Sequence, residues 1–175
     1  MRVRQRTLLN NKDKKSLIAK LVEQYGESVQ SVFDKKDQME YVRLESREEV
    51  YLINETPAIL LSSNPDFGTD KKEVAIPMLN FLANNDFPIK YVVVDAGAIK
   101  FISSGADVMR PGIVEIDPNI KKDEFIAIKE INHKKTLAIG IALFDGQEMQ
   151  SMDAGKVVKS IHHVGDLYYN IGKDL

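Results

Sequence analysis

The sequence predicts an α+β protein of two small domains, with a break in the polar segment 84–88. Three observations support this. An amphipathic helix stands near the start, strand-length apolar segments fill the rest of the first half, and the second half is rich in short strands. With 175 residues, 43% of them hydrophobic, the chain can bury a core in one domain or in two small ones.

The first expected element is a helix, because apolar residues recur there at intervals of three and four. They form one stripe that can face a core: Leu17, Ile18, Leu21, Val22 and Tyr25. We expect Asn11 to cap the helix start through its side-chain oxygen and Gly26 to end it at a positive φ. A shorter helical piece is expected over 28–33.

Three strand-length apolar segments follow, separated by polar breaks, at residues 39–44, 49–54 and 58–62. Residues 74–81 carry apolar side chains at helical spacing, so a helix is expected there. The first domain is therefore predicted to span residues 1–88 and to be a small α+β unit.

The second domain is predicted to span residues 89–175. Strands are expected at 91–94, 107–109, 113–116, 125–131, 136–144 and 157–164, with short helices at 96–103 and 147–152. Many short strands separated by turns favour a compact barrel-like fold over parallel βαβ units.

Composition excludes several classes of chemistry. The chain has no cysteine, which rules out disulfides, thiolate catalysis and Cys-type zinc sites. No apolar run approaches the roughly 20 residues that span a bilayer, and the basic start lacks the apolar stretch of a signal peptide. We therefore expect a cytoplasmic protein that makes no membrane contact.

Charge is unevenly distributed. The net charge is −2, which argues against coating nucleic acid by bulk charge. Within the first twenty residues, however, one acidic residue, Asp13, faces seven basic ones: Arg2, Arg4, Arg6, Lys12, Lys14, Lys15 and Lys20. Such a run is either a solvated surface or a patch that contacts phosphates, and composition does not decide between them.

The most informative segment is 94–113. Asp95 ends a strand and is placed to cap the following helix, and Gly97 permits close approach of another backbone or a ligand. Gly105 breaks that helix. Pro111 and Gly112 are the residue types favoured at the two central positions of a type II turn.

This segment resembles the signature of the PUA domain, in its V-D-x-G-A opening (94–98) and its G-A-x-V-M-x-P-G close (105–112). Residues 122–128, 138–143 and 155–166 are similar to the later strands of the same domain. The resemblance implies a pseudo-barrel of mixed strands with short helices that binds RNA without catalysis.

The whole chain resembles the pre-PUA–PUA proteins of translation, of the malignant-T-cell-amplified-sequence type and its archaeal relatives. The resemblance implies an adaptor of initiation or recycling that contacts the tRNA acceptor end or small-subunit rRNA, with a translation-factor protein as a further partner. It places the RNA site at one edge of the PUA domain, on ten residues: Gly97, Ala98, Lys100, Gly105, Ala106, Asp107, Arg110, Lys156, Lys159 and His162.

Each type of residue at this edge also has a plain structural interpretation. Glycines serve turns, exposed Lys and Arg promote solubility, and a histidine is often a buried, satisfied ring. Among the basic residues Arg110 is the strongest candidate, because its planar guanidinium can bind phosphate through two N–H groups.

Catalysis, metals and cofactors are not expected. His162 and His163 are neighbours on a strand and point to opposite faces, and His133 lies apart in a polar loop. Asp95 is interpreted as a cap rather than a nucleophile. No phosphate-binding loop, dinucleotide motif or Ser–His–Asp set is present.

Two other functions stay open from the sequence. The chain could be an RNA-targeting subunit of an enzyme that modifies tRNA or rRNA. It could instead be a protein-interaction module without RNA affinity, with residues 39–62 and Tyr168-Tyr169 as its docking surface.

Overall fold

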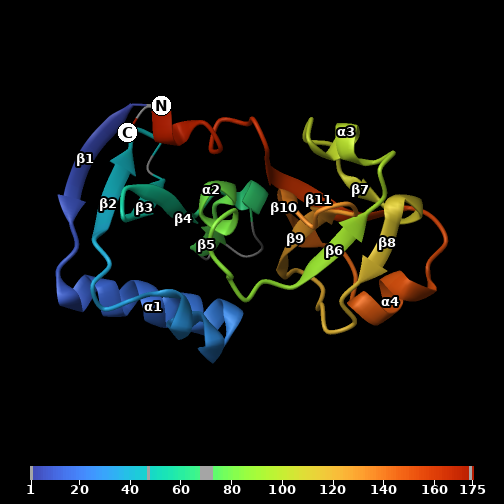
Figure 1. Cartoon of the computed structure of the whole chain (residues 1–175), viewed down its shortest axis with the longest axis horizontal. Coiled ribbons are helices and arrows are strands. Elements are labelled where there is room, and N and C mark those ends of the chain that lie inside the picture. The colour runs from blue at the N-terminus through green and yellow to red at the C-terminus, as the bar shows by residue number, and fades with distance from the viewer. Residues whose placement is uncertain (1, 47, 68–72, 174) are drawn as a thin grey trace. The chain divides into compact units, whose positions relative to one another are not determined.

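The computed structural model describes residues 2–46, 48–67, 73–173 and 175, which form two compact units. The first unit takes in the chain up to Pro88 together with the segment from Asn170 onward, and the second is Ile89–Tyr169 (Figure 1). The predicted division had placed residues 170–175 with the second unit. They group with the first because Ile171, in the 3-10 helix η4 (Ile171–Lys173), is fully buried and η4 packs beside a strand of that unit.

The first unit is built on an antiparallel sheet in which each strand pairs with the next along the chain. Its described strands are β1 (Val3–Leu8), β2 (Met39–Leu44), β3 (Glu49–Ile53), β4 (Thr56–Ser62) and β5 (Val74–Pro77). The predicted strands at 39–44, 49–54 and 58–62 are confirmed as β2, β3 and β4. Their apolar side chains are mostly buried, which explains why the pattern was readable.

The predicted helix is α1 (Asn11–Tyr25), and its cap lies one residue earlier than expected. The Asn10 side chain, not that of Asn11, accepts a hydrogen bond from the Asp13 N–H at 3.0 Å. At the other end Gly26 has φ +94° and its N–H donates to the Val22 carbonyl. A 3-10 helix, η1 (Glu27–Val32), follows directly.

Two elements of this unit differ from the prediction. Strand β1 was not expected, because all six of its residues are exposed and show no buried alternation. Residues 74–81 begin as strand β5, and only Leu79–Leu82 form a helical turn, α2. Pairing of β5 with β4, for example Ile76 with Leu60, outweighs the local helical spacing.

The second unit is a mixed sheet in the order β7-β11-β10-β9-β6-β8. Its strands are β6 (Tyr91–Val94), β7 (Val108–Met109), β8 (Ile113–Ile116), β9 (Phe125–Glu130), β10 (Thr136–Ala142) and β11 (Lys156–His163). The pair β6–β9 is parallel and the others are antiparallel. The two end strands of the sheet, β7 and β8, are joined by one 3-10 turn, η3 (Arg110–Gly112), so the sheet curls toward a closed barrel. The predicted α+β class and strand-rich pseudo-barrel are confirmed.

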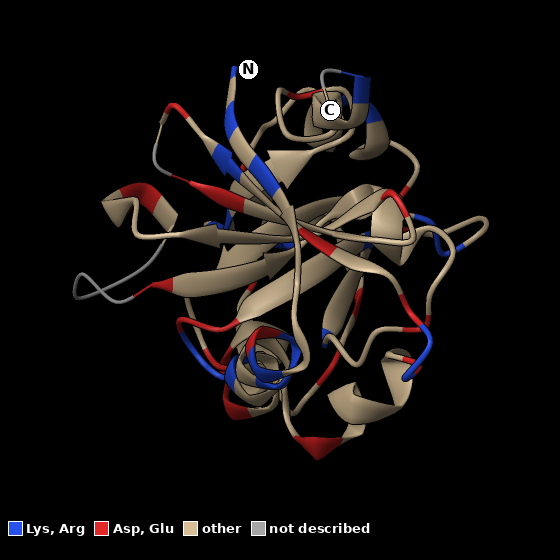
Figure 2. Ribbon diagram, turned by 90° about the vertical axis from the view of Figure 1, so that its left-hand side faces the viewer, with Lys and Arg blue, Asp and Glu red and all other residues tan. Residues whose placement is uncertain are grey.

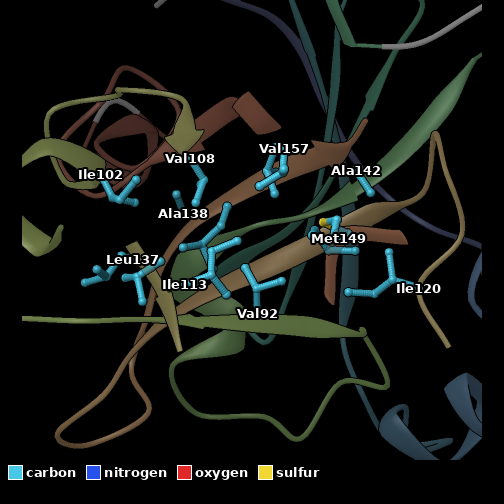
Figure 3. Packing of buried hydrophobic residues seen from close by; sticks show 14 residues of the cluster. Val92, Ile102, Val108, Ile113, Ile120, Leu137, Ala138, Ala142, Met149 and Val157 are labelled. Atoms are coloured by element: carbon cyan, nitrogen blue, oxygen red, sulfur yellow. The ribbon is translucent and has the colours of Figure 1, made fainter. Parts of the chain in front are cut away.

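The barrel is filled by aliphatic side chains that converge from its strands and from the short helix α4 (Gly146–Ser151) (Figure 3). Val92, Val157 and Met149 are fully buried within this cluster. The core holds the sheet ends in place, and with them the segment that carries the predicted site. None of the described helices is long and apolar enough to cross a membrane.

Candidate functional site

The structure places the predicted site residues in three segments. Residues 97–107 contain the one-turn helix α3 (Ile99–Ile102) between β6 and β7, Arg110 begins η3, and Lys156, Lys159 and His162 lie on β11. Asp95 directly follows β6, and its carboxylate accepts a hydrogen bond from the Ala98 N–H at 2.9 Å. The predicted cap therefore forms on the turn that leads into α3, whereas the helix itself starts after Ala98 without a side-chain cap. The Asp95 N–H in turn donates to the Gly112 carbonyl at 2.9 Å. Asp95 therefore holds the start of α3 against the turn that connects β7 to β8.

The three glycines of this segment have different structural reasons. Gly105 has φ +88°, and a Cβ there would lie 2.7 Å from the ring of His163. Gly112 has no positive φ and belongs to η3, so the predicted type II turn is wrong; a Cβ at this position would press on Ala98 at 3.3 Å. The fold therefore requires glycine at 105, and it favours a small residue at 112.

Gly97 is different. Its φ is not in the positive range, and a Cβ there would meet only Asp95 Oδ1, at an ordinary 3.4 Å. The residue is exposed in the turn between β6 and α3. Neither backbone conformation nor packing requires glycine here, which leaves close approach by a ligand as a reason for it.

Arg110 is engaged by the protein itself. Its Nε donates to the Met149 carbonyl at 2.6 Å and its Nη1 to the Ile113 carbonyl at 3.1 Å. The half-buried guanidinium thereby ties η3 to α4. Its role as a phosphate ligand stays a prediction, and only the remaining N–H groups of the fork are open for it.

Asp107 and Lys156 are brought together across the edge of the sheet. Lys156 Nζ lies 3.1 Å from Asp107 Oδ2, and Asp107 Oδ1 accepts from the Ser160 N–H at 2.9 Å. Asp107 thus links the entry to β7 with β11, while Lys159 is half-buried further along β11. Lys100, by contrast, is exposed on α3 and has no ion pair among the described residues.

The two neighbouring histidines separate as the strand geometry predicts. His162 is 2% exposed, and its Nδ1 lies 2.8 Å from the Asp166 carboxylate. The His163 ring is half-buried, with Nδ1 3.1 Å from the Ser103 carbonyl oxygen and the ring against Gly105. Contact of His162 with RNA stays a prediction, and the ring would have to leave the interior to make it.

The carboxyl of Asp166 organises the chain that follows β11. Burial raises its pKa, but hydrogen bonding with His162 and from the N–H groups of Tyr169 and His163 outweighs burial and holds the pKa below its usual value. The folded chain therefore stabilises the ionised form of the Asp166 side chain. In the described part of the chain, no group of three His, Asp or Glu side chains is placed to hold a metal ion.

Two exposed apolar residues beside the site were missed from the sequence. Phe101 on α3 is 64% exposed, and its carbonyl accepts from the Ala106 N–H at 3.0 Å. Met109 on β7 is 52% exposed. The helical spacing could have identified Phe101. Ile99 and Ile102 are three residues apart and both face the core, so Phe101 between them falls on a different side of the helix.

A nearly closed mixed sheet with this strand–helix–strand edge, preceded by a small α+β unit, defines a protein of the pre-PUA–PUA class. Family profiles agree: the Pre-PUA-like domain matches residues 1–85 and the PUA domain matches residues 90–164. The chain belongs to the family of pre-PUA–PUA proteins that includes the malignant T-cell-amplified sequence proteins and archaeal relatives.

Relatives extend over almost the whole chain. An uncharacterized protein of Methanocaldococcus jannaschii is 38% identical over 97% of this chain and 98% of its own length. Translation machinery-associated protein 20 of Saccharomyces cerevisiae is 31% identical over 96% and 93%, respectively. The crystal structure of a hypothetical protein from Pyrococcus horikoshii superposes with a TM-score of 0.78 at 34% identity, covering 96% of this chain and 99% of that one.

Proposed function

We propose that this protein is a non-catalytic RNA-binding adaptor of translation that acts in the cytoplasm. Its PUA domain contacts the tRNA acceptor end or small-subunit rRNA. Family membership and the name of the yeast relative, a translation machinery-associated protein, support the general role. The ten residues predicted at the domain edge remain candidates for the contact surface.

The observation that carries the proposal is the exposed pair Gly97 and Phe101, four residues apart at α3. Gly97 is a glycine that the fold does not require, and Phe101 is an aromatic ring that the core does not use. An unpaired base can stack on an exposed aromatic ring while the RNA backbone passes close to a residue that lacks a side chain.

The electrostatics fit a local site rather than an extended basic groove. Lys100 stands beside Phe101 and is open to solvent, whereas Lys156 and Arg110 are partly engaged by Asp107 and by backbone carbonyls. With a net charge of −2, affinity would rest on shape, stacking and few phosphate contacts. A shallow dependence on salt is therefore expected.

The test is the affinity of the purified protein for deacylated tRNA, with and without its terminal CCA, over a series of salt concentrations. The test variant, Phe101→Ala, removes the ring proposed to stack on a base. The control variant, Val114→Ala, removes another exposed apolar side chain, which lies on β8 and is 49% exposed. We expect Phe101→Ala to weaken binding roughly tenfold, as one lost base stack would. Val114→Ala should bind like the parent.

If neither tRNA binds at low salt, the tRNA version of the proposal fails and isolated small ribosomal subunits become the next ligand to test. If both variants bind equally well, the site does not lie at α3. Co-purification of an RNA-modifying enzyme instead of ribosomal subunits would favour the accessory-subunit function.

A further inference from the structure

The sheet of the first unit has two edges, and one of them is closed by side chains of α1. Gln24 Nε2 donates to the Ala75 carbonyl of β5 at 2.8 Å, and the Ala75 N–H donates to Gln24 Oε1 at 3.0 Å. The Tyr25 hydroxyl donates to the same carbonyl at 2.7 Å. The backbone N–H and C=O of Ala75, at the middle of this edge, are thus satisfied within the unit, which opposes pairing of a further strand there.

The opposite edge, β1, has no such cover. Strand β1 pairs with β2, and no other described residue forms a hydrogen bond to the backbone of Val3–Leu8. The pairing is interrupted at Arg4, the extra residue of a β-bulge, and is regular from Gln5 to Leu8. This regular stretch presents unpaired N–H and C=O groups on its outer side.

A groove runs beside this edge, between β1, the N-terminal half of α1 and one face of the sheet. Its volume is about 370 Å³, and its lining mixes apolar and polar side chains, among them Thr7, Leu8, Leu17, Tyr41 and Tyr51. Leu8 is 61% exposed. Because side chains alternate along a strand, every second residue of an added strand could enter this groove while the others face solvent.

Basic residues outnumber acidic ones along β1 and the first half of α1, where Asp13 is the one acidic residue (Figure 2). Arg6 is paired with Glu40 at 2.6 Å, and Lys20 is paired with Glu73. Five further basic residues before and within these two elements have no ion pair in the described part of the chain: Arg2, Arg4, Lys12, Lys14 and Lys15. Of these, Lys14 donates a hydrogen bond to the Asp37 carbonyl at 2.7 Å. These charges oppose pairing with a second copy of the same edge and favour an acidic strand.

We propose that the β1 edge binds an acidic, extended peptide segment of a partner protein as an additional strand of this sheet. Main-chain hydrogen bonds to Gln5–Leu8 provide affinity, and carboxylates of the segment meet the unpaired Arg and Lys side chains. Nucleic acid could meet the charges, but it has no backbone that continues a β-ladder. The open edge and the groove together therefore favour a peptide over RNA.

The probe is a displayed library of random peptides of about ten residues, the upper length of common strands. We expect selection on the full chain to enrich peptides with Asp or Glu at alternate positions. Bound to the protein, an enriched peptide should slow hydrogen exchange of those β1 amides that do not pair with β2. A version of the peptide methylated on alternate backbone nitrogens should lose binding, because it keeps the charges but not the strand pairing.

Two charge-reversal variants distinguish binding at the β1 edge from a general effect of the protein's net charge. Arg4→Glu should weaken the enriched peptide roughly tenfold, while Lys35→Glu, an equal change at an exposed site after η1, should leave it unchanged. No enrichment, no protection of β1 amides, or equal effects of the two variants would overturn the proposal. So would self-association through β1, or displacement of the peptide by a short RNA that leaves the β1 amides unprotected.

Discussion

At the scale of single residues, the glycines before and after α3 differ in whether the fold requires them. Gly105 combines φ +88° with a His163 ring that occupies the space of a Cβ. Gly97 has an ordinary backbone conformation and room for a methyl group. One glycine therefore serves the fold, and the other is free to serve a ligand.

Alanine substitutions at these two positions should have opposite consequences. Gly105→Ala is expected to lower the free energy of unfolding by about 1–3 kcal/mol, because it adds backbone strain and a contact with the His163 ring. Gly97→Ala should leave stability within about 0.5 kcal/mol of the parent and weaken tRNA binding. Urea titrations and binding assays on both variants test this, and a Gly97→Ala protein with full affinity would remove Gly97 from the site.

Asp166 should make stability depend on pH in the acid range. Its pKa is held below the usual value in the folded chain, so the ionised carboxylate stabilises the fold above the ordinary pKa of 3.8, and this stabilisation is lost as pH falls through the lower folded pKa. Asp166→Asn should therefore be less stable than the parent at pH 7 and approach it near pH 3. Denaturant titrations at the two pH values measure the difference, and an equal difference at both would contradict the assignment.

At the scale of elements, α1 is attached to its sheet by few side chains. Leu17 and Leu21 are its buried residues, and Leu21 is completely inaccessible to solvent. Most of the remaining helix surface is polar and basic. Packing of this narrow stripe, rather than helix propensity, therefore provides most of its stability.

Removing one of these anchors should be costly. Leu21→Ala is expected to lower the free energy of unfolding by about 2–5 kcal/mol, since it leaves a cavity beneath the helix. Lys15→Ala, on the exposed side of the same helix, should change it by less than about 0.5 kcal/mol. Thermal unfolding followed by circular dichroism compares them; similar losses in both variants would mean that the helix does not pack through Leu21.

Most strands that bury apolar residues were predictable, whereas the fully exposed β1 and the short β5 were missed. The ranges 39–44, 91–94 and 113–116 match β2, β6 and β8, because buried apolar side chains mark them. Strand β1 carries no such mark, and β5 follows a partner strand rather than its own helical spacing. The spacing of apolar residues in the sequence indicates which side chains are buried. It does not indicate which other strand a segment pairs with.

At the scale of the whole molecule, the first unit is discontinuous in sequence. The last residues return to it after the second unit is complete: Ile171 is fully buried, and Arg6 Nη1 donates to the Leu175 carbonyl at 2.6 Å. The first unit therefore depends on a segment that follows the second unit in the chain.

Deleting residues 170–175 should destabilise the first unit, because it uncovers apolar surface that Ile171 covers. Hydrogen exchange of β2–β4 should accelerate, while that of β9 and β10 in the second unit should stay close to the parent. Lys173→Ala, an exposed change within the same segment, serves as the control. Faster exchange confined to the second unit would contradict the grouping of this segment with the first.

The sequence alone determined the class of fold, the core strands of the second unit and the family, because these depend on local pattern and on a motif of fixed spacing. Only the tertiary structure decided which side chains are free to act. Arg110 is engaged by the Met149 carbonyl, 39 residues away, and His162 by Asp166, while Phe101 and the β1 edge are left open. The physical reason is that exposure and hydrogen-bond partners depend on chain segments distant in sequence, which local spacing does not encode.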